Sequence, residues 1–318
     1  MTERLLEIEN LRIAFPTRSG PVYGVKGVTM NVGTNERLGV VGESGSGKSV
    51  TALAALGLVQ PPGQVVGGTV RWQGKDVLDP KVAQSLRGRE IAMIFQDPMA
   101  SLNPLMTVQG QICEVLEHRL GMDRNAARAR AVELLELVGI PFPRERLRQY
   151  PYEFSGGMRQ RVMISIALAA EPKLLIADEP TTALDVTIQA QILELLSDLS
   201  KELGVSVMMI THDLGVVAEF CDRVQVMYAG RVVERSPVEP LFSDPSHPYS
   251  AGLIASSPRV DTDLEELVSI PGDPPSHADE HAGCPFHPRC PESDDECRRT
   301  PPPLVEVSPR RWVACWKR

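Results

Sequence analysis

The chain has 318 residues, of which 42% are hydrophobic, and its formal net charge is −8. This length allows one large or two ordinary domains with a sizeable core, and the hydrophobic fraction excludes a largely disordered chain. The negative charge argues against bulk electrostatic binding of nucleic acid. No run of 18 or more apolar residues is present, and no apolar signal segment follows Met1 to Arg4, so we expect a cytoplasmic protein without a membrane span.

Two β-rich runs open the chain, at residues 5–15 and 22–32, and the segment 16–21 between them has the composition of a turn. An antiparallel β layer is therefore expected ahead of the main core. Phe15, at the end of the first run, is a candidate to stack on an adenine ring. Tyr23 is its rival, and ordinary packing is the alternative for either ring.

A phosphate-binding loop is predicted at residues 42–49, which read Gly-Glu-Ser-Gly-Ser-Gly-Lys-Ser and match the pattern G-x-x-x-x-G-K-[ST]. An apolar strand at 37–41 precedes the motif and a helix at 50–58 follows it, as such a loop requires. Its glycines let backbone N–H groups approach phosphate oxygens, and the helix dipole favours an anion there. The candidate ATP ligands of the loop are Gly42, Ser44, Gly45, Gly47, Lys48 and Ser49.

Within this loop the two last residues have distinct roles. Lys48 is placed to reach the β- and γ-phosphates of ATP, and the Ser49 hydroxyl is placed to ligate Mg²⁺. Further along, a short strand at 91–95 ends at Gln96, whose side-chain amide is a candidate for contact with the same Mg²⁺ and an attacking water. Residues 97–154 then form a predicted helical insertion, with helices at 108–120 and 125–138.

A second anion site is predicted at Ser155-Gly156-Gly157, which opens a helix that runs to Ala170. A serine N-cap, two bare backbone N–H groups and the positive end of the helix dipole all favour a phosphate. One nucleotide loop has no use for two such sites within one chain. A dimer would use both sites, if this second site closes on the γ-phosphate held by the partner.

Another apolar strand is predicted at 173–178, and two acidic residues stand at its end. Asp178 ends the strand and is suited to hold Mg²⁺, and Glu179 is the candidate general base for the attacking water. The helix after Asp185 carries a predicted core face, formed by Ile188, Ile192, Leu195, Leu196, Leu199 and Leu203. A further strand at 205–210 leads to His212, which we interpret as a γ-phosphate sensor.

These motifs together closely resemble the ATP-binding cassette family over residues 4–236. The resemblance implies an α/β fold with a P-loop ATPase core, an antiparallel β layer and a helical signature subdomain. It implies a head-to-tail dimer in which Ser155, Gly156, Gly157 and Gln160 contact the partner's ATP, with Asp185 in the D-loop. Phe154 and Met158 depart from the commonest signature, Leu-Ser-Gly-Gly-Gln, and instead fit one subfamily.

The composition changes after Ser236, since 15 of the 27 prolines lie in residues 237–318. We therefore expect a nucleotide-binding domain at 1–236 and an extended, turn-rich C-terminal extension at 237–318. The extension resembles the tail of ATPase subunits of bacterial oligopeptide and dipeptide importers. That resemblance implies uptake of short peptides, with nickel chelates, glutathione or oligosaccharides as other cargoes of the subfamily.

Four cysteines lie in this extension: Cys284, Cys290, Cys297 and Cys315. Disulfides are disfavoured in reducing cytosol, and structural zinc sites usually use closer cysteine pairs. Four widely spaced thiolates suit a [4Fe–4S] cluster, as in some importer ATPases that the chain resembles. Zinc and unligated thiols remain alternatives, and His287 is a weaker substitute ligand. Cys113 and Cys221 are expected to be core thiols.

The subfamily resemblance also implies partners: two membrane permeases, a paralogous ATPase or a second copy of this chain, and an extracytoplasmic binding protein. The chain would then be a peripheral protein on the cytoplasmic face of a bacterial membrane. Soluble cassette ATPases of DNA repair or translation are disfavoured, because they usually carry two cassettes or a long coiled coil. A non-hydrolysing ATP binder is disfavoured by Glu179 and His212.

Overall fold

The computed structural model describes residues 3–182, 184–257, 269–275 and 282–318. It divides into two compact units. The first unit comprises residues 81–208, and the second unit comprises residues 3–80 together with 209–318. The division falls inside one strand, β8 (Ser206–Thr211).

The second unit begins with the expected antiparallel layer, a sheet in the order β2-β1-β4-β5. The alternation of buried and exposed residues along its first strand is kept in phase by a bulge at Asn10, where φ is 47°. Without this extra residue Leu11, which is fully buried, would face solvent. The layer consists of β1 (Arg4–Thr17), β2 (Gly20–Gly33), β4 (Gln64–Trp72) and β5 (Lys75–Asp76).

A second set of strands in this unit carries the phosphate loop. The strand before the loop, β3, pairs in parallel with β9, and β9 pairs antiparallel with β10. All six residues of β9 are buried, which is typical of a strand covered on both faces. The elements are β3 (Arg37–Val41), α1 (Lys48–Ala55), α9 (Leu214–Phe220), β9 (Arg223–Tyr228) and β10 (Arg231–Pro237).

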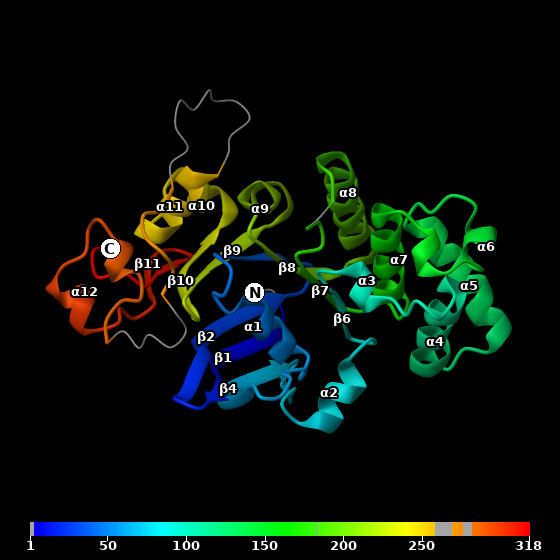
Figure 1. The fold of residues 1–318 in the computed structure, drawn as a ribbon, viewed down its shortest axis with the longest axis horizontal. Coiled ribbons are helices and arrows are strands. Elements are labelled where there is room, and N and C mark those ends of the chain that lie inside the picture. The colour runs from blue at the N-terminus through cyan, green and yellow to red at the C-terminus, as the bar shows by residue number, and fades with distance from the viewer. Residues whose placement is uncertain (1–2, 183, 258–268, 276–281) are drawn as a thin grey trace. The chain divides into compact units, whose positions relative to one another are not determined.

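The C-terminal extension is more regular than its proline content predicts. Its strand β12 pairs antiparallel with β10, with Glu234 opposite Val313, so the extension adds a strand to the sheet instead of lying apart from it. β11 then pairs with β12. Its described elements, yellow to red in Figure 1, are α10 (Val238–Ser243), α11 (Pro248–Ser256), the 3₁₀ helix η2 (His287–Arg289), α12 (Asp295–Arg299), β11 (Val305–Ser308) and β12 (Arg311–Val313).

The first unit contains the parallel pair β6 and β7, in register from Ile91 opposite Leu174 to Ile94 opposite Ala177. The two helices of the predicted insertion are confirmed to within one residue, as α4 and α5. The hydroxyl of Thr107 and the carboxylate of Asp123 cap their N-termini. The elements are α2 (Pro80–Leu86, whose first residue belongs to the second unit), β6 (Ile91–Ile94), α3 (Pro98–Ser101), α4 (Val108–Leu120), α5 (Arg124–Leu137), α6 (Pro143–Arg146), the 3₁₀ helix η1 (Pro151–Glu153), α7 (Gly156–Leu168), β7 (Leu174–Asp178) and α8 (Val186–Leu203).

Candidate functional site

The loop at residues 42–49 has the geometry of an anion-binding turn. It leaves β3 at Val41 and enters α1 at Lys48, so strand, loop and helix follow each other as the motif requires. Gly42 and Gly47 have φ values of 149° and 96°. A Cβ at Gly42 would lie 2.1 Å from the Met227 carbonyl oxygen, and one at Gly47 would lie 2.5 Å from that of Gly24. Only glycine fits both positions.

The loop is folded around its lysine. Lys48 is 6% exposed, and its ammonium donates to the carbonyl oxygens of Gly42, at 2.7 Å, and Glu43, at 3.0 Å. Ser49 at the start of α1 is exposed, as a hydroxyl must be to ligate a metal ion. These two hydrogen bonds hold the loop in shape around the Lys48 ammonium.

Glu179 in the first unit is held by two side chains. Its carboxylate oxygen Oε2 accepts a hydrogen bond from Gln96 Nε2, at 3.1 Å, and one from the Thr182 hydroxyl, at 2.9 Å. Its φ is 47°, a conformation that non-glycine residues rarely adopt and that is often found at functional sites. The structure thus brings together Gln96 and Glu179, which the sequence predicted to act on one water.

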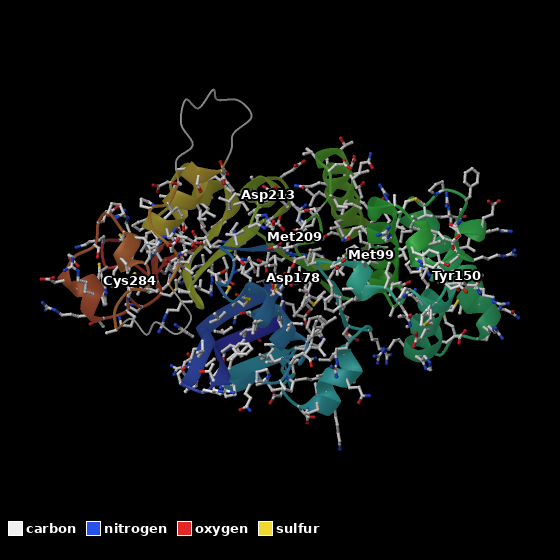
Figure 2. The ribbon with its side chains drawn as sticks, in the orientation of Figure 1. Met99, Tyr150, Asp178, Met209, Asp213 and Cys284 are labelled. Carbon is white, nitrogen blue, oxygen red and sulfur yellow. The ribbon has the colours of Figure 1, made fainter. Side chains whose placement is uncertain are left out.

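Asp178, labelled in Figure 2, is the last residue of β7 and is only 8% exposed. Thr182 is the residue of this group for which we expected no role from the sequence. It lies three residues after Glu179, the spacing at which side chains in a turn meet, and that spacing is the signal in the sequence that could have indicated its role.

His212 lies in the second unit, just past the end of β8, and is exposed, as expected for a residue that contacts a ligand.

Phe15 is half-buried and lies opposite Val22, two residues before the end of β1, which runs on to Thr17. Its ring lies against two glycines, because a Cβ at Gly24 would be 2.9 Å from the ring and one at Gly63 would be 2.7 Å from it. Tyr23 is also half-buried. Both rings therefore keep an accessible part, and the choice between them for adenine stays a prediction.

The signature segment begins α7 as expected. Ser155 is the N-cap, and its hydroxyl accepts from the Met158 N–H at 3.4 Å. Ser155 and Gly156 are exposed, whereas Gln160 is 1% exposed and its Nε2 has no hydrogen-bond partner among the described residues. The exposed part of the segment is therefore its first turn, and Gln160 points into the protein.

The signature segment lies close to the start of α8. A Cβ at Gly157 would lie 2.7 Å from Ile188 Cγ2, so the glycine allows the two helices to approach closely. Asp185 caps α8 by accepting from the Ile188 N–H at 2.9 Å, and its side chain is exposed. The predicted core face of α8 is correct for Ile192, Leu196 and Leu199, but Leu203 is 43% exposed.

The four cysteines of the extension line one small pocket, although they are spread over residues 284–315. Cys284 and Cys297 are buried, Cys290 and Cys315 are half-buried, and none forms a disulfide. Burial raises the pKa of Cys284 to about 11. Among the described residues, no group of three or more His, Cys, Asp or Glu side chains is arranged to hold a metal ion.

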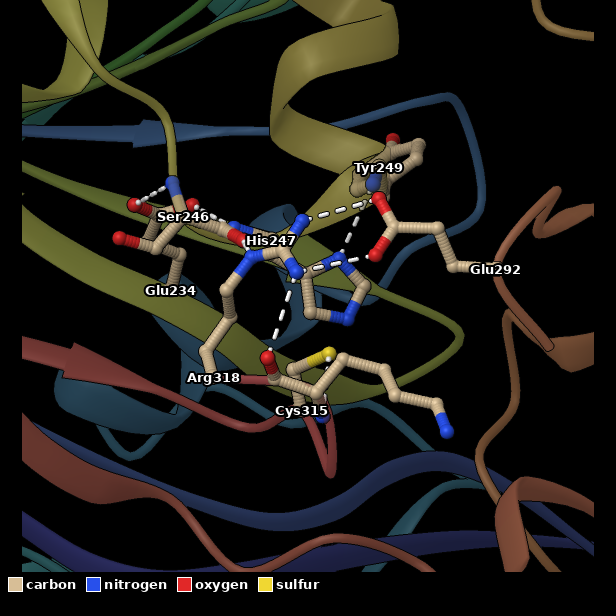
Figure 3. A network of polar contacts seen from close by, with 8 residues as sticks. Glu234, Ser246, His247, Tyr249, Glu292, Cys315 and Arg318 are labelled. Atoms are coloured by element: carbon tan, nitrogen blue, oxygen red, sulfur yellow. Dashed lines mark hydrogen bonds and ion pairs between the residues drawn. The ribbon is translucent and has the colours of Figure 1, made fainter. Parts of the chain in front are cut away.

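Ion pairs and hydrogen bonds close the extension around this pocket (Figure 3). Arg318 forms a bidentate pair with Glu292, with both N–O distances 2.9 Å, and its Nε donates to the Ser246 carbonyl. The backbone N–H groups of Ser246 and His247 donate to the Glu234 carboxylate of β10, at 2.9 and 2.8 Å. These contacts tie the cysteine pocket to the sheet of the second unit.

Comparison with known proteins places these motifs in a family. Residues 25–182 match the model of the ABC transporter family, and residues 233–297 match that of the oligopeptide/dipeptide transporter C-terminal region. The oligopeptide transport ATP-binding protein OppD of Bacillus subtilis is 53% identical, over 98% of this chain and 88% of its own. The dipeptide transport ATP-binding protein DppD of Bacillus subtilis is 48% identical, over 99% and 95%.

Solved structures agree with this result. A dimeric ATP-binding cassette in a post-hydrolysis state, bound to ADP and Pi, matches with a TM-score of 0.66 and 28% identity, over 74% of this chain and 99% of its own. The chain therefore belongs to the ABC transporter ATPases, within the group of oligopeptide and dipeptide transport ATP-binding proteins. It is thus an ATPase. Among the described residues, no helix is long and apolar enough to cross a membrane.

Proposed function

We propose that this chain hydrolyses ATP to energise the import of short peptides across a bacterial cytoplasmic membrane. The observation that carries the proposal is its near full-length similarity to oligopeptide and dipeptide transport proteins, which extends through the C-terminal region. That region distinguishes this group from other cassette ATPases. Uptake of nickel chelates, glutathione or oligosaccharides would use the same ATPase machinery, and the described residues include no site assigned to a cargo.

In this proposal the residues divide the work on ATP. Lys48 and the backbone N–H groups of the loop hold the β- and γ-phosphates, and Ser49, Gln96 and Asp178 hold Mg²⁺. Glu179 accepts the proton of the attacking water while Gln96 and Thr182 fix its carboxylate. His212 contacts the γ-phosphate and Phe15 stacks on adenine.

The exposed first turn of α7 acts on a partner's nucleotide. Ser155 and Gly156 present a hydroxyl and bare N–H groups at a helix N-terminus, which favours a γ-phosphate supplied by a second ATPase subunit. The partner is a paralogous ATPase or a second copy of this chain. We propose that the pair docks on two permeases at the cytoplasmic face of the membrane, and that an extracytoplasmic binding protein delivers the peptide.

The test is to purify the chain with its permeases and binding protein and to identify the bound ligand by mass spectrometry. Short peptides on the binding protein, and ATP hydrolysis stimulated by that loaded protein, are expected. A nickel chelate, glutathione or an oligosaccharide in place of peptides would overturn the cargo assignment. A chain that never co-purifies with membrane subunits would overturn the transport role itself.

We also propose that Cys284, Cys290, Cys297 and Cys315 hold a [4Fe–4S] cluster, with Zn²⁺ as the alternative. The observation behind this proposal is that the four thiols line one small pocket, although they are spread over residues 284–315. Structural Zn²⁺ sites usually use closer cysteine pairs than these, and Cys₄ ligation is what a [4Fe–4S] cluster needs. His287 is engaged elsewhere, since its Nδ1 lies 2.8 Å from the Cys284 carbonyl oxygen. The cluster would crosslink the extension.

Anaerobic purification tests this assignment. Brown protein that absorbs near ~400 nm, with about four irons per chain, is expected from Cys₄ ligation of a [4Fe–4S] cluster. Cys290→Ser should lose the iron and make the extension sensitive to protease while ATP binding persists. Cys113→Ala, which removes a buried thiol of α4, should keep the iron. Colourless protein with one zinc per chain would favour the zinc site instead.

A further inference from the structure

Residues of the C-terminal extension form hydrogen bonds with the phosphate loop, and they contact it at Glu43. This residue follows Gly42 in the loop, and no part of the motif specifies it. The Glu43 carboxylate accepts from Arg289 Nη1 at 2.8 Å and from Arg289 Nη2 at 3.0 Å. The Glu43 backbone N–H donates to the hydroxyl of Tyr249, at 2.8 Å. Both partners belong to the extension.

The opposite side of Glu43 faces the lysine that binds phosphate. The Glu43 carbonyl oxygen accepts from Lys48 Nζ at 3.0 Å and from the Ser46 N–H at 3.2 Å. One residue therefore joins the side chain of Arg289 to the ammonium of Lys48. A displacement of Glu43 changes the position of the carbonyl that orients this ammonium.

Arg289 is committed to this contact. Its side chain is only 5% exposed, and all five of its N–H groups have an acceptor. Besides Glu43, they donate to the carbonyl oxygens of Pro271, at 2.9 Å, and Ile270, at 3.4 Å, and to the Tyr228 hydroxyl, at 3.3 Å. A bidentate pair between a buried guanidinium and a carboxylate is both strong and specific in direction.

An aromatic cluster of Tyr228, Tyr249 and Phe286 supports the pair. All three side chains are at most 2% exposed. Tyr228 belongs to β9, and its ring centroid lies 4.5 Å from that of Tyr249 and 5.3 Å from that of Phe286. The guanidinium of Arg289 lies 5.8 Å from the centre of the Tyr228 ring. Core and extension are thus packed together directly behind the loop.

We propose that Arg289 and Tyr249 are positioning residues for ATP binding, which hold Glu43 so that the phosphate loop is pre-formed. Cys290 follows Arg289 directly. A change in the conformation of the cysteine-containing segment would therefore move Arg289 and, through it, the phosphate loop. The inference rests on the role of residues 42–49 in ATP binding. A loop that must be ordered at the moment of binding costs affinity, so loss of the contact should weaken ATP binding more than it slows the chemical step.

The main test compares Mg-ATP binding and steady-state hydrolysis in the full-length chain and its variants. We expect Arg289→Gln to raise the Kd and KM for ATP about tenfold, because it removes one strong charged hydrogen-bonded contact. The kcat should change by less than about twofold. Arg289→Lys keeps the charge but not the planar fork and should rescue only part of the affinity. Tyr249→Phe removes one hydroxyl and should raise the Kd by a smaller factor without disturbing the core.

A matched control separates positioning from general support of the extension. Arg318→Gln removes another bidentate arginine–glutamate pair of the extension, which does not touch the loop. It should lower the melting temperature and leave the Kd for ATP unchanged. If Arg318→Gln and Arg289→Gln raise the Kd equally, the loop is not specifically positioned and the proposal is wrong.

A double-mutant cycle provides the second criterion. Because Glu43 and Arg289 act as one pair, Glu43→Gln combined with Arg289→Gln should raise the Kd no more than either change alone. Additive effects would contradict the proposal. Lys48→Ala serves as the reference: if it fails to weaken ATP binding, the ATP-site assignment itself is wrong, whatever the result at Arg289.

Discussion

Glu179 tests the chemistry at the scale of one residue. We expect Glu179→Gln to keep ATP binding and to lower turnover by roughly 10²–10⁴-fold, because an amide cannot accept the proton of the attacking water. The Gln96 and Thr182 contacts reach one oxygen of the carboxylate, and an amide oxygen can still accept both of them. Steady-state ATPase assays and equilibrium binding separate the two effects. Turnover close to that of the unmodified chain would contradict the assignment.

Cys221 gives a pH-dependent prediction at the same scale. The thiol packs against Gly39 of β3, and burial raises its pKa to about 12. In the unfolded chain a thiol ionises near pH 8.5, so its contribution to stability is complete below that pH and is lost as the pH rises towards 12. Between pH 8.5 and 10, thermal unfolding should show a steeper loss of stability in the unmodified chain than in Cys221→Ala. Equal slopes would contradict a buried neutral thiol.

At the scale of elements, a buried ion pair joins β9 to the segment between β2 and β3. Arg223 Nε lies 2.7 Å from Glu36 Oε1, and the two side chains are 8% and 18% exposed. Glu36→Gln leaves the guanidinium buried without its counter-ion, so we expect it to lower the free energy of unfolding by about 3–5 kcal/mol.

Glu7→Gln is the matched control for that change. Glu7 pairs with Arg4, whose side chain is 62% exposed, and the loss of such a surface pair should cost about 0–1 kcal/mol. Chemical denaturation of both variants measures the two costs. Similar losses in the two variants would show that burial does not strengthen the Arg223 pair.

Local sequence signals predicted the elements that depend on local physics. The phosphate loop lies between a strand and a helix, and α4 begins at the residue after its Thr107 cap, because caps, glycines and periodicity act over a few residues. The expected turn at 16–21 is shorter, since β1 and β2 run on to Thr17 and Gly20. Pairing between strands overrides a composition that favours a turn.

Contacts between distant residues could not be predicted in this way. Glu43 and Arg289 are 246 positions apart, and neither position follows a pattern that points to the other. The strand β12 was missed because its three residues alternate weakly, and it forms by pairing with β10 and β11, which lie far from it or follow no clear pattern in the sequence. Gln160 shows the same limit, because Ser155 and Gly156 of the same segment are exposed, whereas the packing of α7 buries Gln160.

At the scale of the whole molecule, the signature should matter to a second subunit. We expect Ser155→Arg to leave ATP binding at this chain's own loop intact and to abolish hydrolysis at the partner's loop, because a bulky cation replaces the N-cap hydroxyl. In the assembled complex, ATP binding to each subunit and total hydrolysis measure the two effects. Loss of binding at this chain's own loop would rule out the shared site.

The pairing of β10 with β12 also has a consequence for synthesis on the ribosome. Glu234 is translated well before its partner Val313. At a translation rate of about 5–20 residues per second, the edge of β10 stays without β12 for several seconds. During that interval the phosphate loop and its flanking strand and helix already exist, while the sheet beside them presents unpaired backbone groups. A premature stop between the two strands should therefore yield a fragment that aggregates through this edge instead of a smaller soluble ATPase.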